Sequence, residues 1–217
     1  MSGLEPGDTA PEFNLKNANS KENLVYTSLD DVMGTNGAII VFECNHCPYV
    51  VGSIDRINKI ANYSLENNIG FVGINSNDAI NYPDDSFEAM QKRAMKGMPY
   101  GYLHDESQEV AKEWGAERTP EFYLLDSNKV VVYRGRMDDS PKNPMHATTS
   151  ELLDAVNALI SNESLILNRT NSIGCSVKWK VCDIAPWNTS TYFCHDVETS
   201  TRSRGRSNVE MVVSKTS

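Results

Sequence analysis

The sequence predicts an α/β fold in which helices cover a central mixed β-sheet. Two apolar runs, 38–42 and 69–74, are typical of buried strands, and a helical pattern follows each of them. Two further apolar segments, 122–125 and 130–133, flank the turn-forming residues 126–128 and indicate a β-hairpin. Strands that alternate with helices and then form a hairpin predict an α/β sandwich with parallel and antiparallel strand pairs.

The first half of the chain supplies the strand and helix that flank the main motif. Residues 1–23 are mostly polar and rich in turn-forming residues. We expect a short strand over 24–27, followed by a helical turn that Ser28 caps. Residues 47–67 have apolar side chains at gaps of three and four, which predicts one helix with a single buried face. Pro48 suits the first turn of that helix, where a missing N–H group costs nothing.

Two helices and a strand are expected before the hairpin, and one more helix is expected after it. Ser86 is placed to cap a helix over 86–96, and a strand is expected over 100–103. Residues 108–114 carry apolar side chains on one side of a short helix. The final amphipathic helix is expected over 149–160.

The 217 residues are enough for one well-packed domain, which we expect to span residues 1–180. Residues 181–217 are rich in Ser, Thr and Arg and lack a clear hydrophobic period. This composition predicts a poorly ordered C-terminal tail.

Charge and hydropathy restrict the classes of partner. The net charge of −9 argues against nonspecific binding to nucleic acid or to an anionic membrane. No apolar run approaches the ~20 residues of a membrane span. The N-terminus lacks the basic start and apolar core of a secretory signal, so we expect a cytoplasmic protein.

Cys44 and Cys47 form a CxxC motif directly after the buried strand 38–43, where a helix is expected to begin. Free N–H groups and the positive dipole end of a helix N-terminus favour a thiolate, which is the reactive form of cysteine. Five cysteines are too few and too unevenly spaced for a disulfide-stapled scaffold. The motif therefore predicts redox chemistry, which needs no cofactor because the dithiol itself carries two electrons.

Several sequence blocks, including the CxxC motif, occur along the chain in the order expected for a known family. They are Pro11-Glu12-Phe13, Cys44-Asn45-His46-Cys47-Pro48-Tyr49-Val50, Gly73-Ile74-Asn75-Ser76-Asn77-Asp78, Tyr82-Pro83-Asp84-Asp85-Ser86-Phe87, Thr119-Pro120-Glu121, Gly135-Arg136-Met137-Asp138-Asp139 and Gly174-Cys175-Ser176-Val177-Lys178-Trp179-Lys180. With these blocks the chain resembles peroxiredoxin-like redoxins of the AhpC/TSA superfamily, over roughly residues 5 to 180.

The resemblance implies a thioredoxin-like α/β/α sandwich with a central mixed sheet. It also implies that Pro120 follows a cis peptide bond, packs against the dithiol and belongs to the catalytic site. The backbone of Thr119 would then offer hydrogen bonds to an incoming substrate chain. Asn75 follows the second buried strand, at the sheet edge where such folds bind ligands, and is expected to border the site.

The order of attack by the two cysteines has two interpretations. By analogy with thioredoxin, Cys44 is the more exposed residue and attacks first, and Cys47 resolves the mixed disulfide. A peroxiredoxin interpretation makes Cys47 the peroxidatic residue, with Cys44 resolving its sulfenic acid. In that alignment Cys44 stands where peroxiredoxins have Thr or Ser, so the hydroxyl that helps to position peroxide is missing.

Two neighbours of the cysteines are expected to act in opposite directions. An imidazolium at His46 would stabilise a thiolate and lower the pKa of Cys44, whereas a solvated His46 would have little effect. The Glu43 carboxylate would disfavour a nearby thiolate. Thioredoxins usually carry Trp at the position of Glu43, so this chain departs from the usual docking surface for substrates.

Cys175 lies in a block shared with the family and is either a packing cysteine, which we favour, or a redox relay for the dithiol. The main functional prediction is a thiol–disulfide oxidoreductase that acts on a protein disulfide or a hydroperoxide and receives electrons from a thioredoxin-type donor. The alternatives are an atypical peroxidase and a metal-binding or metallochaperone module that uses Cys44, His46 and Cys47. Because peroxiredoxin relatives often dimerise, a homodimer is a candidate assembly.

Overall fold

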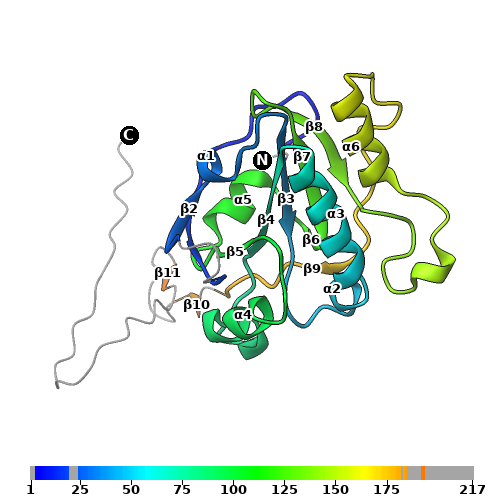
Figure 1. The fold of residues 1–217 in the computed structure, drawn as a ribbon. Helices are drawn as coiled ribbons and strands as arrows, with labels where there is room; N and C mark the ends of the chain where they lie inside the picture. The colour runs from blue at the N-terminus through cyan, green and yellow to red at the C-terminus, as the bar shows by residue number, and fades with distance from the viewer. Residues whose placement is uncertain (1–2, 20–23, 182, 185–191, 194–217) are drawn as a thin grey trace, which may run out of the picture. The chain divides into compact units, whose positions relative to one another are not determined.

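The computed structural model describes residues 3–19, 24–181, 183–184 and 192–193. The chain forms two compact units, residues 1–179 and 180–217. The first unit is a thioredoxin-like α/β fold with a seven-stranded mixed sheet, in the order β2-β1-β5-β4-β3-β7-β8 (Figure 1). The predicted fold class is therefore confirmed.

The centre of the sheet consists of three parallel strands, which are β3 (Gly37–Phe42), β4 (Ile69–Asn75) and β5 (Gly101–His104). The hairpin of β7 (Glu121–Leu125) and β8 (Val131–Gly135) joins the other side of β3 in antiparallel pairing. Every residue of β3 and β4 is buried, as their unbroken apolar runs predicted.

Strand β1 (Asn14–Asn17) lies in the polar N-terminal stretch, where the sequence pattern gave no strand. It pairs in antiparallel fashion with β2 (Tyr26–Ser28) on one side and with β5 on the other. Its sequence, Asn-Leu-Lys-Asn, carries little apolar alternation. Backbone hydrogen bonds to two neighbours thus form a strand that side-chain patterning does not reveal.

Helices pack on both faces of the sheet and enclose two hydrophobic cores. Along β3, Ile39 and Val41 face one core, and Ile40 and Phe42 face the other. The first core also includes buried side chains of α3 (Ile54–Glu66), α4 (Phe87–Ala94) and α6 (Glu151–Ser161). The second includes side chains of α1 (Leu29–Val32), which Ser28 caps as predicted, and α5 (Glu109–Trp114).

The helix predicted over 47–67 is divided into α2 (Pro48–Val51) and α3, so the prediction of one helix is wrong. The break falls at Gly52 and Ser53. A Cβ at Gly52 would lie 3.1 Å from Lys142 Cα, so another part of the backbone approaches closely here. The Ser53 hydroxyl donates to the Pro141 carbonyl at 2.8 Å. Tertiary contacts, which the helical periodicity cannot show, therefore end the first turn after the motif.

Two short strands outside the main sheet were not predicted, namely β6 (Arg118–Thr119) and β9 (Cys175–Ser176), which pair in antiparallel fashion. In the second unit, β10 (Asp183–Ile184) pairs with β11 (Tyr192–Phe193). Most of the predicted tail 181–217, including Cys182 and Cys194, lies outside the described residues, and its poor order stays a prediction.

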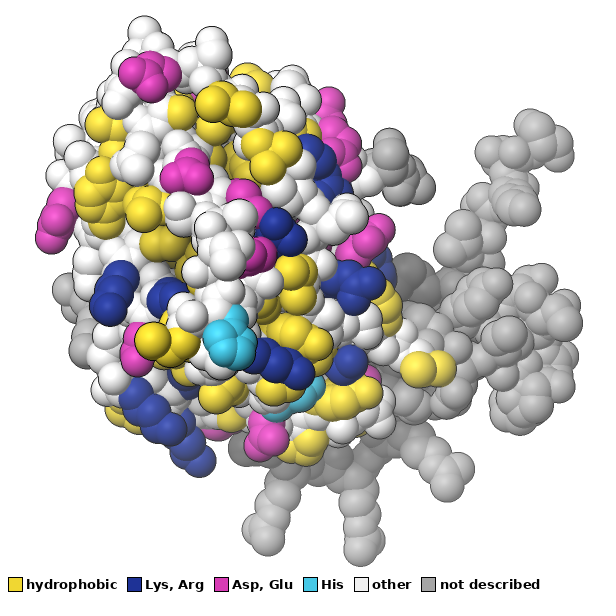
Figure 2. All heavy atoms as spheres, turned by 90° about the vertical axis from the view of Figure 1, so that its right-hand side faces the viewer, with side chains coloured by type: hydrophobic (Ala, Val, Ile, Leu, Met, Phe, Trp, Pro, Cys, Tyr) yellow, Lys and Arg dark blue, Asp and Glu magenta, His cyan; other side chains and the backbone are white. Residues whose placement is uncertain are grey.

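Two short 3₁₀ helices complete the elements, at Pro83–Asp85 and Pro144–His146. Among the described residues, no helix is both long and apolar enough to cross a membrane. Figure 2 shows that positive and negative side chains are interspersed with hydrophobic ones on the face that is turned to the viewer.

Candidate active site

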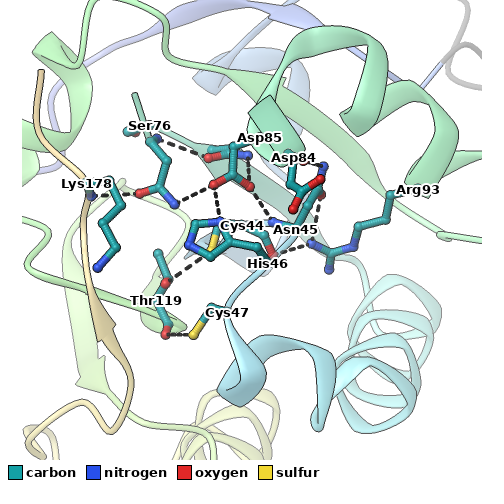
Figure 3. A network of polar contacts seen from close by, with 12 residues as sticks. Cys44, Asn45, His46, Cys47, Ser76, Asp84, Asp85, Arg93, Thr119 and Lys178 are labelled. Atoms are coloured by element: carbon teal, nitrogen blue, oxygen red, sulfur yellow. Dashed lines mark hydrogen bonds and ion pairs between the residues drawn. The ribbon is translucent and has the colours of Figure 1, made fainter. Parts of the chain in front are cut away.

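Cys44 and Cys47 lie just beyond the carboxyl end of β3, at the start of α2, and Thr119 lies opposite them (Figure 3). The peptide bond between Thr119 and Pro120 is cis, as the resemblance implied. The Thr119 hydroxyl is 3.4 Å from Cys44 Sγ, and its carbonyl oxygen is 3.1 Å from Cys47 Sγ. One residue before the cis-proline thus contacts both sulfur atoms.

Both cysteines of the motif are buried, each with an exposed fraction of 0%. The expectation that Cys44 is the more exposed of the two is therefore wrong. Cys44 follows a strand that is buried on both faces, and Val50 of α2 packs against both cysteines. The order of the two cysteines in the motif therefore does not predict which one is more exposed to solvent.

Hydrogen bonding lowers the pKa of Cys47 to about 4, and the thiol of Cys44 is the main donor. The Cys175 thiol and the backbone N–H groups of Val50 and Cys175 also donate to this sulfur, and together these bonds outweigh its desolvation. The Thr119 carbonyl acts in the opposite direction, because it accepts a hydrogen bond from the protonated form. Four donors against one acceptor make Cys47 the thiolate.

The pKa of Cys44 is raised well above its usual range. Its hydrogen bond to Cys47 is the largest cause, and burial and the negative charge of Asp85 add to it. The Thr119 hydroxyl opposes these effects only in part. The proton that the two thiols share therefore stays on Cys44, whereas the thioredoxin analogy placed the attacking thiolate there.

Asp85 is a fully buried carboxylate beside Cys44 that the sequence analysis did not single out. It accepts the backbone N–H of Asn45 at 2.7 Å and the side-chain amide of Asn77 at 2.8 Å. The amide of Asn75 donates to it at 3.2 Å. Its location in the shared block 82–87 was the available signal, but its orientation depends on three segments that meet only in the fold.

His46 is paired with this carboxylate, with 2.6 Å between His46 Nδ1 and Asp85 Oδ2. Its ring also stacks on Tyr82, with 5.3 Å between the ring centroids and 7° between the planes. A quarter of the His46 side chain is exposed. An imidazolium at this place is compensated by Asp85, so its predicted effect on the thiolate is weakened.

Glu43 is fully buried and paired with Arg93, and the Tyr100 hydroxyl donates to it at 2.9 Å. A Cβ at Gly73 would lie 2.3 Å from Glu43 Oε1, so a glycine makes room for this carboxylate. Arg93 also donates to the Cys44 carbonyl at 2.8 Å. The Arg93 charge compensates Glu43, which weakens the predicted effect of Glu43 on the thiolate.

Three ligand atoms, from Cys44, His46 and Asp85, lie within 4.8 Å of one another and could hold a metal ion. The third residue of this set is Asp85, in place of Cys47 in the predicted set. A thiol, an imidazole and a carboxylate are all ligands that zinc accepts, and binding would release the thiol proton. The metal-binding alternative therefore stays a prediction, with Asp85 in place of Cys47.

The fold brings most of the predicted site residues together, but Asn75 differs from the others. Asn75 is fully buried and its amide contacts Asp85, so its predicted role in binding substrate stays a prediction. Cys175 is half-buried and packs against the two motif cysteines. Its close contact with Cys47 connects a block near residue 175 with the dithiol.

Solved structures with similar folds include two proteins with more than 30% sequence identity and one with less than 20%. An uncharacterized conserved protein from Geobacillus kaustophilus is 41% identical, with a TM-score of 0.76, over 82% of this chain and 93% of the other. A hypothetical protein from Sinorhizobium meliloti is 32% identical, with a TM-score of 0.75, over 82% and 96%. Peroxidoxin BcpB from Mycobacterium tuberculosis, at 17% identity and a TM-score of 0.55 over 74% and 99%, shares the thioredoxin-like fold.

A search of the curated proteins gave no match. The family model for Redoxin matches residues 5–154, which include the β3–α2 junction with both motif cysteines. This match supports a redox role in general terms. The chain belongs to the Redoxin family.

Proposed function

We propose that the protein is a thiol–disulfide oxidoreductase in which Cys44 and Cys47 carry the two electrons and Cys47 attacks first. The substrate class is a protein disulfide, and a thioredoxin-type protein restores the reduced state. The observation that carries the proposal is the position of both sulfur atoms beside Thr119, the residue before the cis-proline, with Cys175 packed against the motif. Hydrogen bonding from the neighbouring thiols and backbone N–H groups lowers the pKa of Cys47 to about 4. These donors stabilise the reactive thiolate at neutral pH.

The reaction takes place in two exchange steps. The Cys47 thiolate attacks one sulfur of the substrate disulfide, the substrate S–S bond breaks, and a mixed disulfide with Cys47 forms. The Cys44 sulfur, after losing its proton to the departing substrate thiolate, then attacks Cys47 Sγ. The mixed disulfide breaks, the Cys44–Cys47 disulfide forms, and the second substrate sulfur leaves as a thiolate that takes a proton from water, which gives a dithiol.

Insulin reduction with dithiothreitol as the electron source tests this proposal. We expect Cys47→Ser to lower the rate by about a hundredfold or more, because the attacking thiolate is lost. The double variant Cys44→Ser, Cys175→Ser, which lacks both thiols that lie beside Cys47, is expected to accumulate the mixed disulfide with Cys47, visible by mass spectrometry. Cys194→Ser, which leaves the motif intact, is the matched control. Wild-type protein that does not reduce insulin faster than dithiothreitol alone would contradict the proposal.

A peroxidase is the second candidate function, because the thiolate lies on the cysteine that a peroxidase would use. The Cys47 thiolate would attack the O–O bond of a hydroperoxide, which gives a sulfenic acid and an alkoxide that takes a proton from water. The Cys44 thiol would then condense with the sulfenic acid, with release of water. Thr119 supplies a hydroxyl near Cys44, at 3.4 Å from its sulfur. Consumption of hydroperoxide at a rate that exceeds insulin reduction would favour this candidate.

A further inference from the structure

Strand β9 lies along the edge of β6, next to the dithiol. The antiparallel register places Thr119 opposite Cys175 and Arg118 opposite Ser176. Gly174 permits this close approach, because a Cβ there would lie 2.1 Å from the Thr119 carbonyl oxygen. The backbone edge that the sequence analysis assigned to an incoming substrate chain is therefore paired with a segment of the same protein.

The residues after Cys175 fix this segment in place. The Val177 N–H donates to the Glu117 carbonyl at 3.0 Å. The Lys178 N–H donates to the Asn77 side chain, and the Lys178 carbonyl accepts the Asp78 N–H, both at 2.8 Å. Figure 3 shows Lys178 on the same side of the site as Ser76, away from Arg93. Cys175 thus has a defined position beside the motif.

Cys175 differs from the other described cysteines in both contact and access. It packs against the group of Cys44, Cys47 and Val50, and hydrogen bonding from Cys175 contributes to the lowered pKa of Cys47. Among the three described cysteines, it alone is partly exposed, whereas the other two are fully buried. A partner protein therefore reaches Cys175 before it reaches either sulfur of the motif.

We propose that Cys175 is a third redox-active cysteine, which takes the place of Cys44 in a disulfide with Cys47 and connects the buried pair to partner proteins. This proposal rests on the function proposed above. It assigns Cys47 two alternative partners, one buried and one partly exposed. The partner protein that acts at Cys175 is a dithiol reductant.

The exchange neither adds nor removes electrons. The Cys175 thiolate attacks Cys47 Sγ in the Cys44–Cys47 disulfide, that bond breaks, and a Cys47–Cys175 bond forms. Cys44 leaves as a thiolate and takes up the proton that Cys175 released. A thiolate of the reductant then attacks Cys175 Sγ, and Cys47 leaves as the stabilised thiolate. The second thiol of the reductant displaces Cys175, which gives an oxidised partner and a fully reduced enzyme.

Disulfide mapping of the full-length chain tests the connection directly. Cys44→Ser protein is oxidised with a small disulfide such as oxidised glutathione, alkylated, digested and analysed by mass spectrometry. We expect most of Cys47 to be linked to Cys175 in this variant, and the same link in Cys44→Ser combined with Cys182→Ser. Cys47 that remains as a glutathione adduct beside alkylated, unlinked Cys175 would overturn the proposal.

Reduction kinetics test the role of the link in the wild-type sequence. The Cys44–Cys47 disulfide is formed in wild-type and Cys175→Ser proteins, and a thioredoxin reduces both. We expect the disulfide of the Cys175→Ser protein to be reduced at least about tenfold more slowly than that of the wild type. Equal reduction rates would overturn the relay. Failure of the proposed function has a different signature, because the Cys44→Ser protein would then form the Cys47–Cys175 link while the wild-type protein would not reduce insulin.

Discussion

The two cysteines of the motif lie three positions apart and have opposite surroundings. Cys47 meets hydrogen-bond donors, which are two thiols and two backbone N–H groups. The Cys44 thiol is close to the negative charge of Asp85, and it donates its hydrogen bond to Cys47. Neither side chain is exposed to solvent, and burial raises the pKa of both thiols. The comparison shows that tertiary partners, rather than order in the motif, decide which sulfur is ionised.

The same comparison applies to the two carboxylates near Cys44. Glu43 is compensated by Arg93, and it lies against Gly73 and Tyr100. Asp85 is held by amide groups and His46, and its charge raises the pKa of Cys44. The charge of Asp85 thus raises the pKa of Cys44, whereas the charge of Glu43 is offset by Arg93.

The largest expected effect is a pH dependence of stability in the reduced protein. The pKa of Cys47 falls from its ordinary value of 9.0 to about 4 on folding, so between these values the unfolded chain binds one more proton. Stability therefore rises with pH in this window and is lost as pH falls through about 4. Relative to Cys47→Ser, the free energy of unfolding should rise by at most about 1.4 kcal/mol per pH unit.

Denaturant unfolding of both reduced proteins at several pH values between 5 and 8, roughly the centre of that window, measures this difference. Parallel curves for wild type and Cys47→Ser would show that Cys47 is not ionised in the folded protein. Because the pKa of Cys44 is raised, Cys44 has the opposite effect above pH 9.0, where the folded protein keeps its proton and stability falls with pH.

The second prediction concerns the thiol that donates to Cys47. A hydrogen bond to a charged group contributes about 1.5–3 kcal/mol, which corresponds to about 1–2 pKa units. Cys44→Ala should therefore raise the pKa of Cys47 by about this amount, measured by the ultraviolet absorbance of the thiolate. Cys44→Ser, which keeps a donor, should raise it less. An equal or larger rise in Cys44→Ser would argue against the hydrogen bond as the cause.

The third prediction concerns Asp85. Asp85→Asn removes a negative charge that faces Cys44, so the pKa of Cys44 should fall and its alkylation at mildly alkaline pH should become several-fold faster. Asp84→Asn changes the neighbouring residue, which contacts Asn45 through its carbonyl, and is the matched control. Equal alkylation rates of Cys44 in the two variants would place the Asp85 charge too far away to matter.

The smallest effect on the thiols is expected for Glu43→Gln. The titration of Cys47 should be unchanged, because Arg93 already compensates the Glu43 charge. The free energy of unfolding should nevertheless fall by about 3 kcal/mol, since one partner of a buried ion pair is removed. A clear shift in the thiolate titration would mean that Glu43 acts on the dithiol directly.

Much of the fold follows from sequence patterns that have a physical cause. The unbroken apolar runs locate β3 and β4 correctly. The capping residues Ser28 and Ser86 likewise locate the starts of α1 and α4. Strand β1 and the break at Gly52 could not be predicted, because backbone pairing and close contacts with distant residues produce them. Local patterns contain no information about such partners.

The candidate site was only partly predictable for the same reason. Cys44, Cys47 and the cis bond before Pro120 follow from the motif and the family resemblance. The ionisation of Cys47 depends on Cys175, which is more than a hundred residues away in sequence. The position of Asp85 beside His46 likewise depends on a loop after β4. These relations are set by packing, so they required the structure.

The pairing of β9 with β6 also has a consequence for biosynthesis. A chain leaves the ribosome from its N-terminus, so both motif cysteines and Thr119 emerge well before residues 174–178. Until those residues arrive, the edge of β6 is unpaired and the sulfur of Cys47 lacks the two donors from Cys175. The nascent protein therefore passes through a stage in which the dithiol has neither its final cover nor its final acidity, and the last strand of the unit completes both.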